Sequence, residues 1–277
     1  MKTTLLFLSV FLSASLFSQN VYIPDANFKA YLVGSQWINT NGDTEIQVSE
    51  ASSFNGIIQV NSSNISNLTG IEAFTSLTYL YCEDNELTSL DVSQNTALNY
   101  LWCFNNQLTS LDVSNNTDLL VLRCNSLQLT SLDVSQNTAL TLLRCAYNSL
   151  TSLDVSQNLA LTHLGCDVNQ LTSLDLRNGN NQNFSYFNVT GNPNLTCINV
   201  DNVTYSTTNW TNIDAQHYFS TNCPPPLPPQ TYVPDDNFEA YLEANGMGNG
   251  VANDDSVTTS NIIGITFLNI SSKAISD

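Results

Sequence analysis

Few side chains in this sequence could perform acid–base or nucleophilic chemistry. Its two histidines are His163 and His217, and neither belongs to a metalloprotease H-E-x-x-H pattern. The nucleophile pattern G-x-S-x-G and the glycine-rich phosphate loop are also missing from the sequence. We therefore expect the visible chain not to be an enzyme and to need no cofactor, and we interpret His163 as a contact residue rather than a base.

One segment could bind a metal ion. Residues 39–50 resemble the calcium loop of an EF-hand, in which oxygen ligands recur at fixed positions. The candidate ligands are Asn39, Asn41, Asp43 and Glu50, with Ile46 at the eighth position of the loop. Thr44 departs from the pattern because it replaces the glycine of the sixth position, and asparagine replaces aspartate at the first. A weak Ca²⁺ site and an ordinary asparagine- and glycine-rich turn both remain open.

Seven cysteines in a chain that we expect to be exported suggest disulfides. Five of them recur every 21 residues, namely Cys82, Cys103, Cys124, Cys145 and Cys166. We expect these five to be buried thiols that act as small apolar side chains. No histidine accompanies them, and a line of equal spacing is not the tetrahedron that zinc needs. Cys197 and Cys223 remain, and we expect them to form a disulfide.

The cysteines follow an internal repeat. The string LTSLD recurs every 21 residues, beginning at Leu87, Leu108, Leu129, Leu150 and Leu171. From Leu77, one unit reads L-x-x-L-x-C-x-x-N-x-L-x-x-L-D-V-S-x-N-x-x. Over about residues 65–200 this pattern resembles the short 21-residue class of bacterial leucine-rich repeats and is similar to internalin-like proteins. The resemblance implies a secreted leucine-rich-repeat solenoid, nominally an α/β horseshoe, that recognises a protein or a glycan.

Each repeat is itself double, because residues 87–97 and 98–107 both follow L-x-x-L-x-apolar-x-x-N. Ten or eleven residues hold a strand and a turn but no helix. In each half, strand alternation points the second leucine and the following Val or Cys inward and the residue between them outward. We expect a mostly β, right-handed coil with a parallel strand on each side, and coils about 4.8 Å apart.

Asparagine recurs at the turns of these coils, where a side-chain amide can pair with turn backbone. One column is Asn95, Asn116, Asn137 and Asn158, and the other is Asn85, Asn106, Asn148 and Asn169. Leu127 interrupts the second column, and we favour packing over binding as its role.

The chain divides into six segments. Residues 1–18 have the basic start and short apolar run of a signal peptide, with cleavage expected after Ser18. The others are an N-terminal cap (19–76) with a helix near Asp25, the repeat array (77–200), an irregular C-terminal cap (201–223) and a proline-rich linker (224–231). Residues 232–277 repeat the N-terminal cap at an offset of 210, so we expect a second cap that is truncated. A second array, a sorting domain or a catalytic domain would then lie beyond Asp277.

The charge balance limits the possible partners. Lys and Arg number 6 against 24 Asp and Glu, for a net charge of −18. Nucleic acid and anionic membranes are therefore poor partners. No stretch after the expected signal peptide is apolar enough to span a membrane.

Copies of the repeat differ most at the outward positions around the cysteine. The candidate ligand-binding residues there are Tyr79, Tyr81, Tyr100, Trp102, Phe104, Arg123, Arg144 and His163. Aromatic residues and arginine dominate binding hot spots, whereas strand propensity alone could also place aromatic residues there. We expect an extracellular or cell-surface recognition or adaptor protein; the alternative is a structural or adhesive spacer without a specific ligand.

The LTSLD half, in contrast, barely changes between copies. It places Asp91, Asp112, Asp133, Asp154 and Asp175 in one column, where like charges repel unless they are compensated. Screening by neighbouring Ser and Thr hydroxyls and water is favoured over bound cations. We interpret this column as scaffold.

Overall fold

The computed structural model describes residues 19–224, 230–233, 235–248, 250–251, 256–258 and 262. The chain forms two compact units, Met1–Cys223 and Pro224–Asp277. The expected signal peptide, residues 225–229 of the linker and most of the expected second cap after Val251 lie outside the described residues. Within the described part of the chain, no helix has the length and apolar character needed to cross a membrane.

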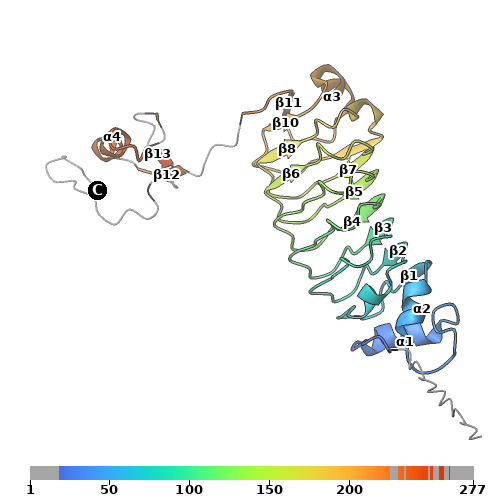
Figure 1. Ribbon diagram of the computed structural model, residues 1–277. Helices are drawn as coiled ribbons and strands as arrows, with labels where there is room; N and C mark the ends of the chain where they lie inside the picture. The colour runs from blue at the N-terminus through green and yellow to red at the C-terminus, as the bar shows by residue number, and fades with distance from the viewer. Residues whose placement is uncertain are drawn as a thin grey trace, which may run out of the picture. The chain divides into compact units, whose positions relative to one another are not determined.

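The first unit begins with a helical cap (Figure 1). Helix α1 (Ala26–Gly34) starts at Asp25, whose side chain accepts hydrogen bonds from the backbone N–H groups of Asn27 and Phe28, both at 3.0 Å. Phe28 and Leu32 are fully buried on one face of this helix. Helix α2 (Val48–Ser53), strand β1 (Ile57–Gln59) and the 3₁₀ turn η1 (Ile71–Ala73) complete the cap. The cap thereby covers the apolar end of the first coil.

A seven-stranded parallel sheet runs along the side of the coils that carries the cysteines. After β1 its strands are β2 (Tyr79–Tyr81), β3 (Tyr100–Trp102), β4 (Val121–Arg123), β5 (Leu142–Arg144), β7 (His163–Gly165) and β9 (Tyr186–Asn188). Strands β2 to β7 pair residues 21 positions apart, as in Leu101 with Leu122. The central leucines are fully buried, and so are the cysteines that follow each strand. The repeat therefore forms the parallel solenoid expected from its spacing.

The opposite side of the coils is less regular than expected. Its sheet contains only β6 (Ser152–Asp154), β8 (Ser173–Asp175), β10 (Cys197–Asn199) and β11 (Tyr218–Ser220). The three earlier LTSLD segments do not form strands, so the expectation of a strand on both sides of every coil was wrong for these coils. In the part that does form strands, Arg177 pairs with Asp175 of β8 and interacts electrostatically with Asp154 of β6.

Asparagine side chains connect successive coils. Asn116 and Asn137 each donate two hydrogen bonds to backbone carbonyls of the preceding coil, at 2.9–3.0 Å. In the other column, Asn106 donates to three carbonyls, and its Oδ1 accepts from the backbone N–H of Leu87. Leu127 interrupts that column and is buried in the core, as expected for packing. Each column thus satisfies turn backbone that the coils would otherwise leave unpaired.

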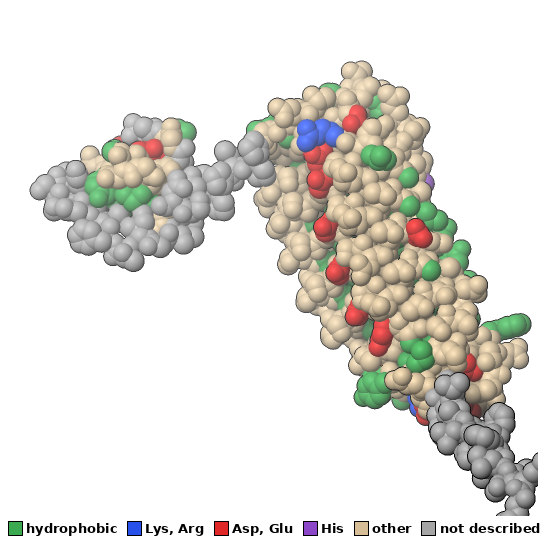
Figure 2. Space-filling model, viewed as in Figure 1, with side chains coloured by type: hydrophobic (Ala, Val, Ile, Leu, Met, Phe, Trp, Pro, Cys, Tyr) green, Lys and Arg blue, Asp and Glu red, His purple; other side chains and the backbone are tan. Residues whose placement is uncertain are grey.

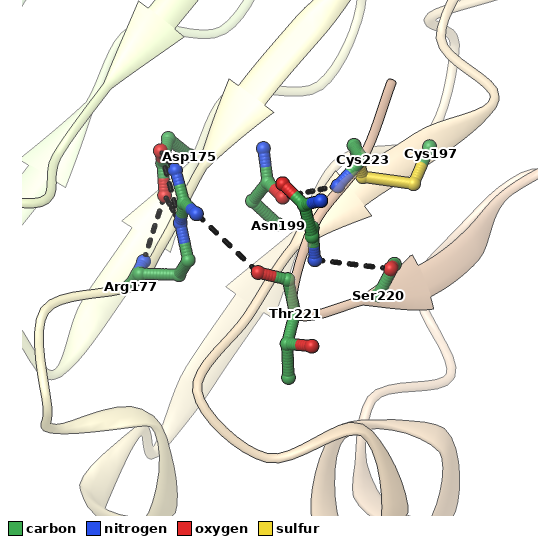
Figure 3. Close-up of a disulfide and its surroundings, with 8 residues drawn as sticks. Asp175, Arg177, Cys197, Asn199, Ser220, Thr221 and Cys223 are labelled. Carbon is green, nitrogen blue, oxygen red and sulfur yellow. Dashed lines mark hydrogen bonds and ion pairs between the residues drawn. A yellow bond between two sulfur atoms is a disulfide. The ribbon is translucent and has the colours of Figure 1, made fainter.

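An aromatic cluster closes the far end of the array. Helix α3 (Val203–Asn209) leads into Trp210, whose ring stacks on Phe187 with a centroid distance of 4.3 Å. Strand β11 then adds to β10 in parallel. Cys197, at the start of β10, is joined to Cys223 by a disulfide, as Figure 3 shows. Arg177 donates to the Thr221 carbonyl oxygen beside this disulfide at 3.3 Å. The last coil is therefore covered and covalently tied to the end of the first unit.

The described part of the second unit repeats elements of the first cap. Helix α4 (Asp236–Ala244) lies 210 positions after α1, and Asp235 caps it by accepting from the backbone N–H of Phe238 at 2.8 Å. Strands β12 (Gln230–Tyr232) and β13 (Ser256–Thr258) pair antiparallel, where the first cap has an antiparallel bridge between Asn20 and Gln47. This local similarity matches the repetition in the sequence.

Candidate recognition surface

The outer face of the seven-stranded sheet presents three columns of side chains, which together we call the variable surface. The first column is Tyr79, Tyr100, Val121, Leu142, His163 and Tyr186. The second is Tyr81, Trp102, Arg123, Arg144, Gly165 and Asn188. The third comes two residues later in each coil, at Glu83, Phe104, Asn125, Ala146 and Asp167. The parallel register thus brings all eight candidate ligand-binding residues onto one face.

At the N-terminal end of the variable surface, aromatic rings stack across neighbouring strands. The rings of Tyr79 and Tyr100 lie 4.6 Å apart with an interplanar angle of 19°. Those of Tyr81 and Trp102 lie 4.5 Å apart at 39°. Because each ring is supported by a neighbour in register, these side chains lose little further freedom on binding.

Two arginines continue the second column. The guanidinium carbon Cζ of Arg123 lies 4.4 Å from the ring centroid of Trp102, and that of Arg144 lies 4.5 Å from the ring centroid of Tyr186. Their Nε atoms are shielded from solvent and have no hydrogen-bond partner among the described residues. Burial, and then the positive charge of Arg144, lowers the pKa of Arg123 from its ordinary value. The surface therefore holds two adjacent cations in fixed positions.

Sequence reasoning missed Tyr186 and the role of Gly165. Tyr186 lies in register with His163, and its ring reaches over the glycine toward Arg144. A Cβ on Gly165 would lie 3.4 Å from the Tyr186 ring and 3.7 Å from Cγ of Arg144. A larger side chain there would displace the ring. Continuing the outward positions past the extra residues before Phe184 would have identified Tyr186.

Two carboxylates flank the arginines in the third column. Glu83 follows β2 and is 8% exposed, and its Oε2 atom has no hydrogen-bond partner among the described residues. Asp167 follows β7. Burial raises the pKa of Glu83 and the pKa of Asp167 above their ordinary values. The charged forms of both side chains are therefore disfavoured where they stand.

His163 and Phe104 occupy different parts of the variable surface. His163 Nδ1 lies 2.9 Å from the Thr162 hydroxyl, and its Nε2 lies 3.2 Å from the Ser185 hydroxyl. Phe104 is partly buried in the third column. The contacts of His163 are with hydroxyl groups, which fits a contact residue.

The EF-hand-like loop is closed by its own hydrogen bonds. Glu50 Oε1 accepts from the backbone N–H groups of Thr40 and Asn41, at 2.7 and 3.1 Å, and Oε2 accepts from that of Gln47 at 3.0 Å. Burial alone would raise the pKa of Glu50, but these bonds outweigh it and lower the pKa. Asp43 accepts from the backbone of Glu45 at 2.7 Å. No group of three His, Cys, Asp or Glu side chains in the described ranges is placed to hold a metal ion. The Ca²⁺ site stays a prediction.

The aspartate column lies on the opposite side of the coils. Figure 2 shows acidic side chains that follow one another along this side of the first unit. Asp112 and Asp133 each accept a hydrogen bond from the backbone N–H of the serine two residues later, at 2.9 and 2.8 Å, which lowers the pKa of both. A hollow beside the column is lined partly by Ser131 and Ser152. The serines thus stabilise the charged carboxylates from within the repeat.

The five repeat cysteines are fully buried and free. Burial raises the pKa of Cys103 and of Cys145 to about 12, and it raises the pKa of the other three well above the ordinary value. Such thiols are not nucleophiles at neutral pH. They act as core side chains between the coils.

Residues 75–116 match the family model described as leucine-rich repeats in two copies. Internalin J of Listeria monocytogenes serotype 4b (strain F2365) is 39% identical over 80 residues. That match covers 28% of this chain and 8% of the relative, so the chain spans a small part of that protein's length.

Solved structures of internalins are also similar. One is described as the functional domain of InlJ from Listeria monocytogenes, which includes a cysteine ladder; it is 30% identical, covers 66% of this chain and 53% of that chain, and has a TM-score of 0.42. Internalin C2 from the same organism is 15% identical, covers 73% of this chain and 97% of that chain, and has a TM-score of 0.48.

The family-model match falls on the same repeats that form the parallel sheet, from before β2 to past β3. Residues 75–116 are leucine-rich repeats, and the chain is similar to internalins over these and the neighbouring repeats.

Proposed function

We propose that this protein recognises a protein partner outside the cell through the variable surface. Internalin-like leucine-rich-repeat proteins are typically scaffolds for binding and recognition rather than enzymes. The observation that carries the proposal is the position of Arg123 and Arg144, which stand beside a stacked aromatic ladder without acidic partners among the described residues. Aromatic residues and arginine are enriched in binding hot spots. The disulfide between Cys197 and Cys223 supports an extracellular location.

The experiment compares two triple variants of the full chain. The first is Trp102→Ser, Arg123→Gln and Arg144→Gln on the variable surface; its control on the opposite side is Asp112→Asn, Asp133→Asn and Asp154→Asn. Each variant captures proteins from an extracellular-matrix extract, and mass spectrometry quantifies them. We expect at least one protein that the wild type and the control retain and the surface variant loses. Equal capture by all three would contradict the proposal.

A spacer function is the second candidate, and the second unit favours it. Helix α4 repeats α1 at an offset of 210, which indicates modules in tandem. A spacer without a ligand predicts that substitutions on the variable surface change no captured protein. The capture experiment therefore distinguishes the two functions.

A further inference from the structure

Two of the basic side chains in the first unit differ from the other two because they form no ion pair with the described residues. The first unit has four after the expected signal peptide, namely Lys29, Arg123, Arg144 and Arg177. Lys29 pairs with Glu45 at 2.6 Å, and Arg177 pairs with Asp175 at 2.5 Å. Within the described part of the chain, neither Arg123 nor Arg144 has a carboxylate within 4.0 Å. In a chain with 24 acidic residues, two unpaired arginines on adjacent strands are the feature to explain.

The aromatic rings hold both guanidinium groups. Arg123 rests on Trp102 and Arg144 on Tyr186, so the planes of both groups are supported from outside the pair. Strand pairing places the two backbones in direct register. Burial and the positive charge of the neighbouring Arg144 both disfavour the charged form of Arg123 in the free protein. An anion that bound both would relieve that repulsion and accept hydrogen bonds from the guanidinium groups.

The surrounding side chains limit where that anion can bind. Glu83 stands after β2 and Asp167 after β7, so carboxylates flank the two central strands that carry the arginines. A uniformly anionic polymer that covered the whole variable surface would place negative charges beside Glu83 and Asp167. A ligand with its negative charge concentrated near β4 and β5 would not.

The aromatic rings favour a polypeptide over a sugar. Sugars bind aromatic side chains by stacking on an open ring face. Here Tyr79 stacks on Tyr100, and Trp102 lies between Tyr81 and Arg123. Tyr186 is likewise covered by Arg144. Ring edges and hydroxyl groups suit the side chains and backbone of a protein segment.

We propose that the variable surface binds an acidic segment of a protein partner, with Asp or Glu carboxylates against Arg123 and Arg144 and apolar or aromatic neighbours against Tyr79 and Tyr100. This inference rests on the proposed function and names the chemistry of the partner. Glu83 and Asp167 confine the acidic contact to the two central strands. Tyr186 and Gly165 position Arg144 for that contact.

The test measures binding of a defined probe, a random copolymer of glutamate and tyrosine, to the full chain by biolayer interferometry. At physiological salt the screening length is about 8 Å, so the overall negative charge of the chain is largely screened at longer range. The test variant is Arg123→Gln with Arg144→Gln. The matched control is Lys29→Gln with Arg177→Gln, which changes the net charge equally but leaves the variable surface intact. Thermal melts verify that both variants fold.

We expect the test variant to lose about tenfold or more in affinity, since hydrogen bonds to charged groups are being removed, and the control to stay within about twofold of the wild type. A variant with Tyr186→Ser, which keeps both arginines, should lose an intermediate amount. Equal losses in test and control variants would overturn the proposal. So would tighter binding of polygalacturonate with the same dependence on Arg123 and Arg144, because the ligand would then be an acidic glycan.

The possible outcomes distinguish a failure of the acidic-partner proposal from a failure of the proposed function. If Trp102→Ser abolishes capture of an extracellular protein while the double arginine variant does not, the proposed function stands and the acidic partner is wrong. If the copolymer does not bind the wild type, the acidic partner is wrong as well. If no substitution on the variable surface changes capture, both are wrong.

Discussion

The two sides of each coil come from half-repeats of nearly equal length, yet they differ in charge, variation and regularity. The side with the cysteines forms a continuous sheet and changes its outward residues from coil to coil. The LTSLD side keeps its sequence, and only its last copies form strands. Its carboxylates bond to serines of their own coil, whereas Arg123 and Arg144 have no such partner among the described residues. The carboxylates of one side are stabilised within their own coil, whereas the two arginines of the other side have no carboxylate partner among the described residues.

We expect the LTSLD side to contribute most to stability, because its asparagine side chains donate hydrogen bonds to buried turn carbonyls. Replacing Asn137 by Ala removes donors from the carbonyl oxygens of Val113 and Asn116. We expect a loss of about 1–3 kcal/mol in the free energy of unfolding, since two buried hydrogen bonds are removed while each carbonyl keeps one backbone donor. Denaturant unfolding followed by circular dichroism measures it. Asn137→Asp should cost more, because its carboxylate would face the two carbonyls.

The neighbouring Gln136 is an exposed control in the same turn. Gln136→Ala should change the unfolding free energy by less than about 0.5 kcal/mol. If Asn137→Ala were equally mild, the asparagine column would not stabilise the turns, and the LTSLD side would lose its role as scaffold.

The variable side also tolerates strain in its turns. Val168 has a backbone φ of 53°, which is costly for a β-branched residue. The equivalent position three coils earlier is Asn105, which has the same φ. Val168→Asn should stabilise the protein by about 1 kcal/mol. A rise in the midpoint of denaturant unfolding at unchanged slope would show this, and a fall would mean that contacts of Val168 outweigh the strain.

The smallest expected effects are opposite pH dependences on the two sides. Burial raises the pKa of Glu83, so its ionised form weakens the fold at neutral pH. Glu83→Gln should therefore stabilise the protein at pH 7, and the gain should disappear as the pH falls from the raised pKa to below the ordinary value of 4.5. Thermal melts from pH 7 to pH 3 measure this dependence.

Asp133 should behave in the opposite way. Hydrogen bonds from Ser135 lower its pKa, so its contribution to stability is present above the unfolded value of 3.8 and is lost as the pH falls through the folded pKa. Asp133→Asn should slightly destabilise the protein at pH 7 and make no difference at low pH. If both variants shifted stability in the same direction, the two sides would not differ in how they satisfy their carboxylates.

The repeat period made much of this fold predictable. A spacing of 21 residues fixes which side chains are stacked, so the sheet register and the buried columns followed from the sequence, as did the helical cap at Asp25. The absence of early strands on the LTSLD side was not predictable, because the sequence of this half is nearly the same in copies that form strands and in copies that do not. Tyr186 was missed because extra residues interrupt the spacing before it, and its contact with Arg144 crosses a whole strand.

The most direct test blocks one side of a single coil at a time. Val121→Cys places a thiol on the variable surface and Ser131→Cys places one on the LTSLD side, while the native repeat thiols are buried and have raised pKa values. Each new thiol is coupled to polyethylene-glycol maleimide, and capture of extracellular-matrix proteins is then measured. The account predicts that modification at residue 121 abolishes capture and modification at residue 131 leaves it unchanged. Capture that survives modification at 121, or is lost only with modification at 131, would contradict it.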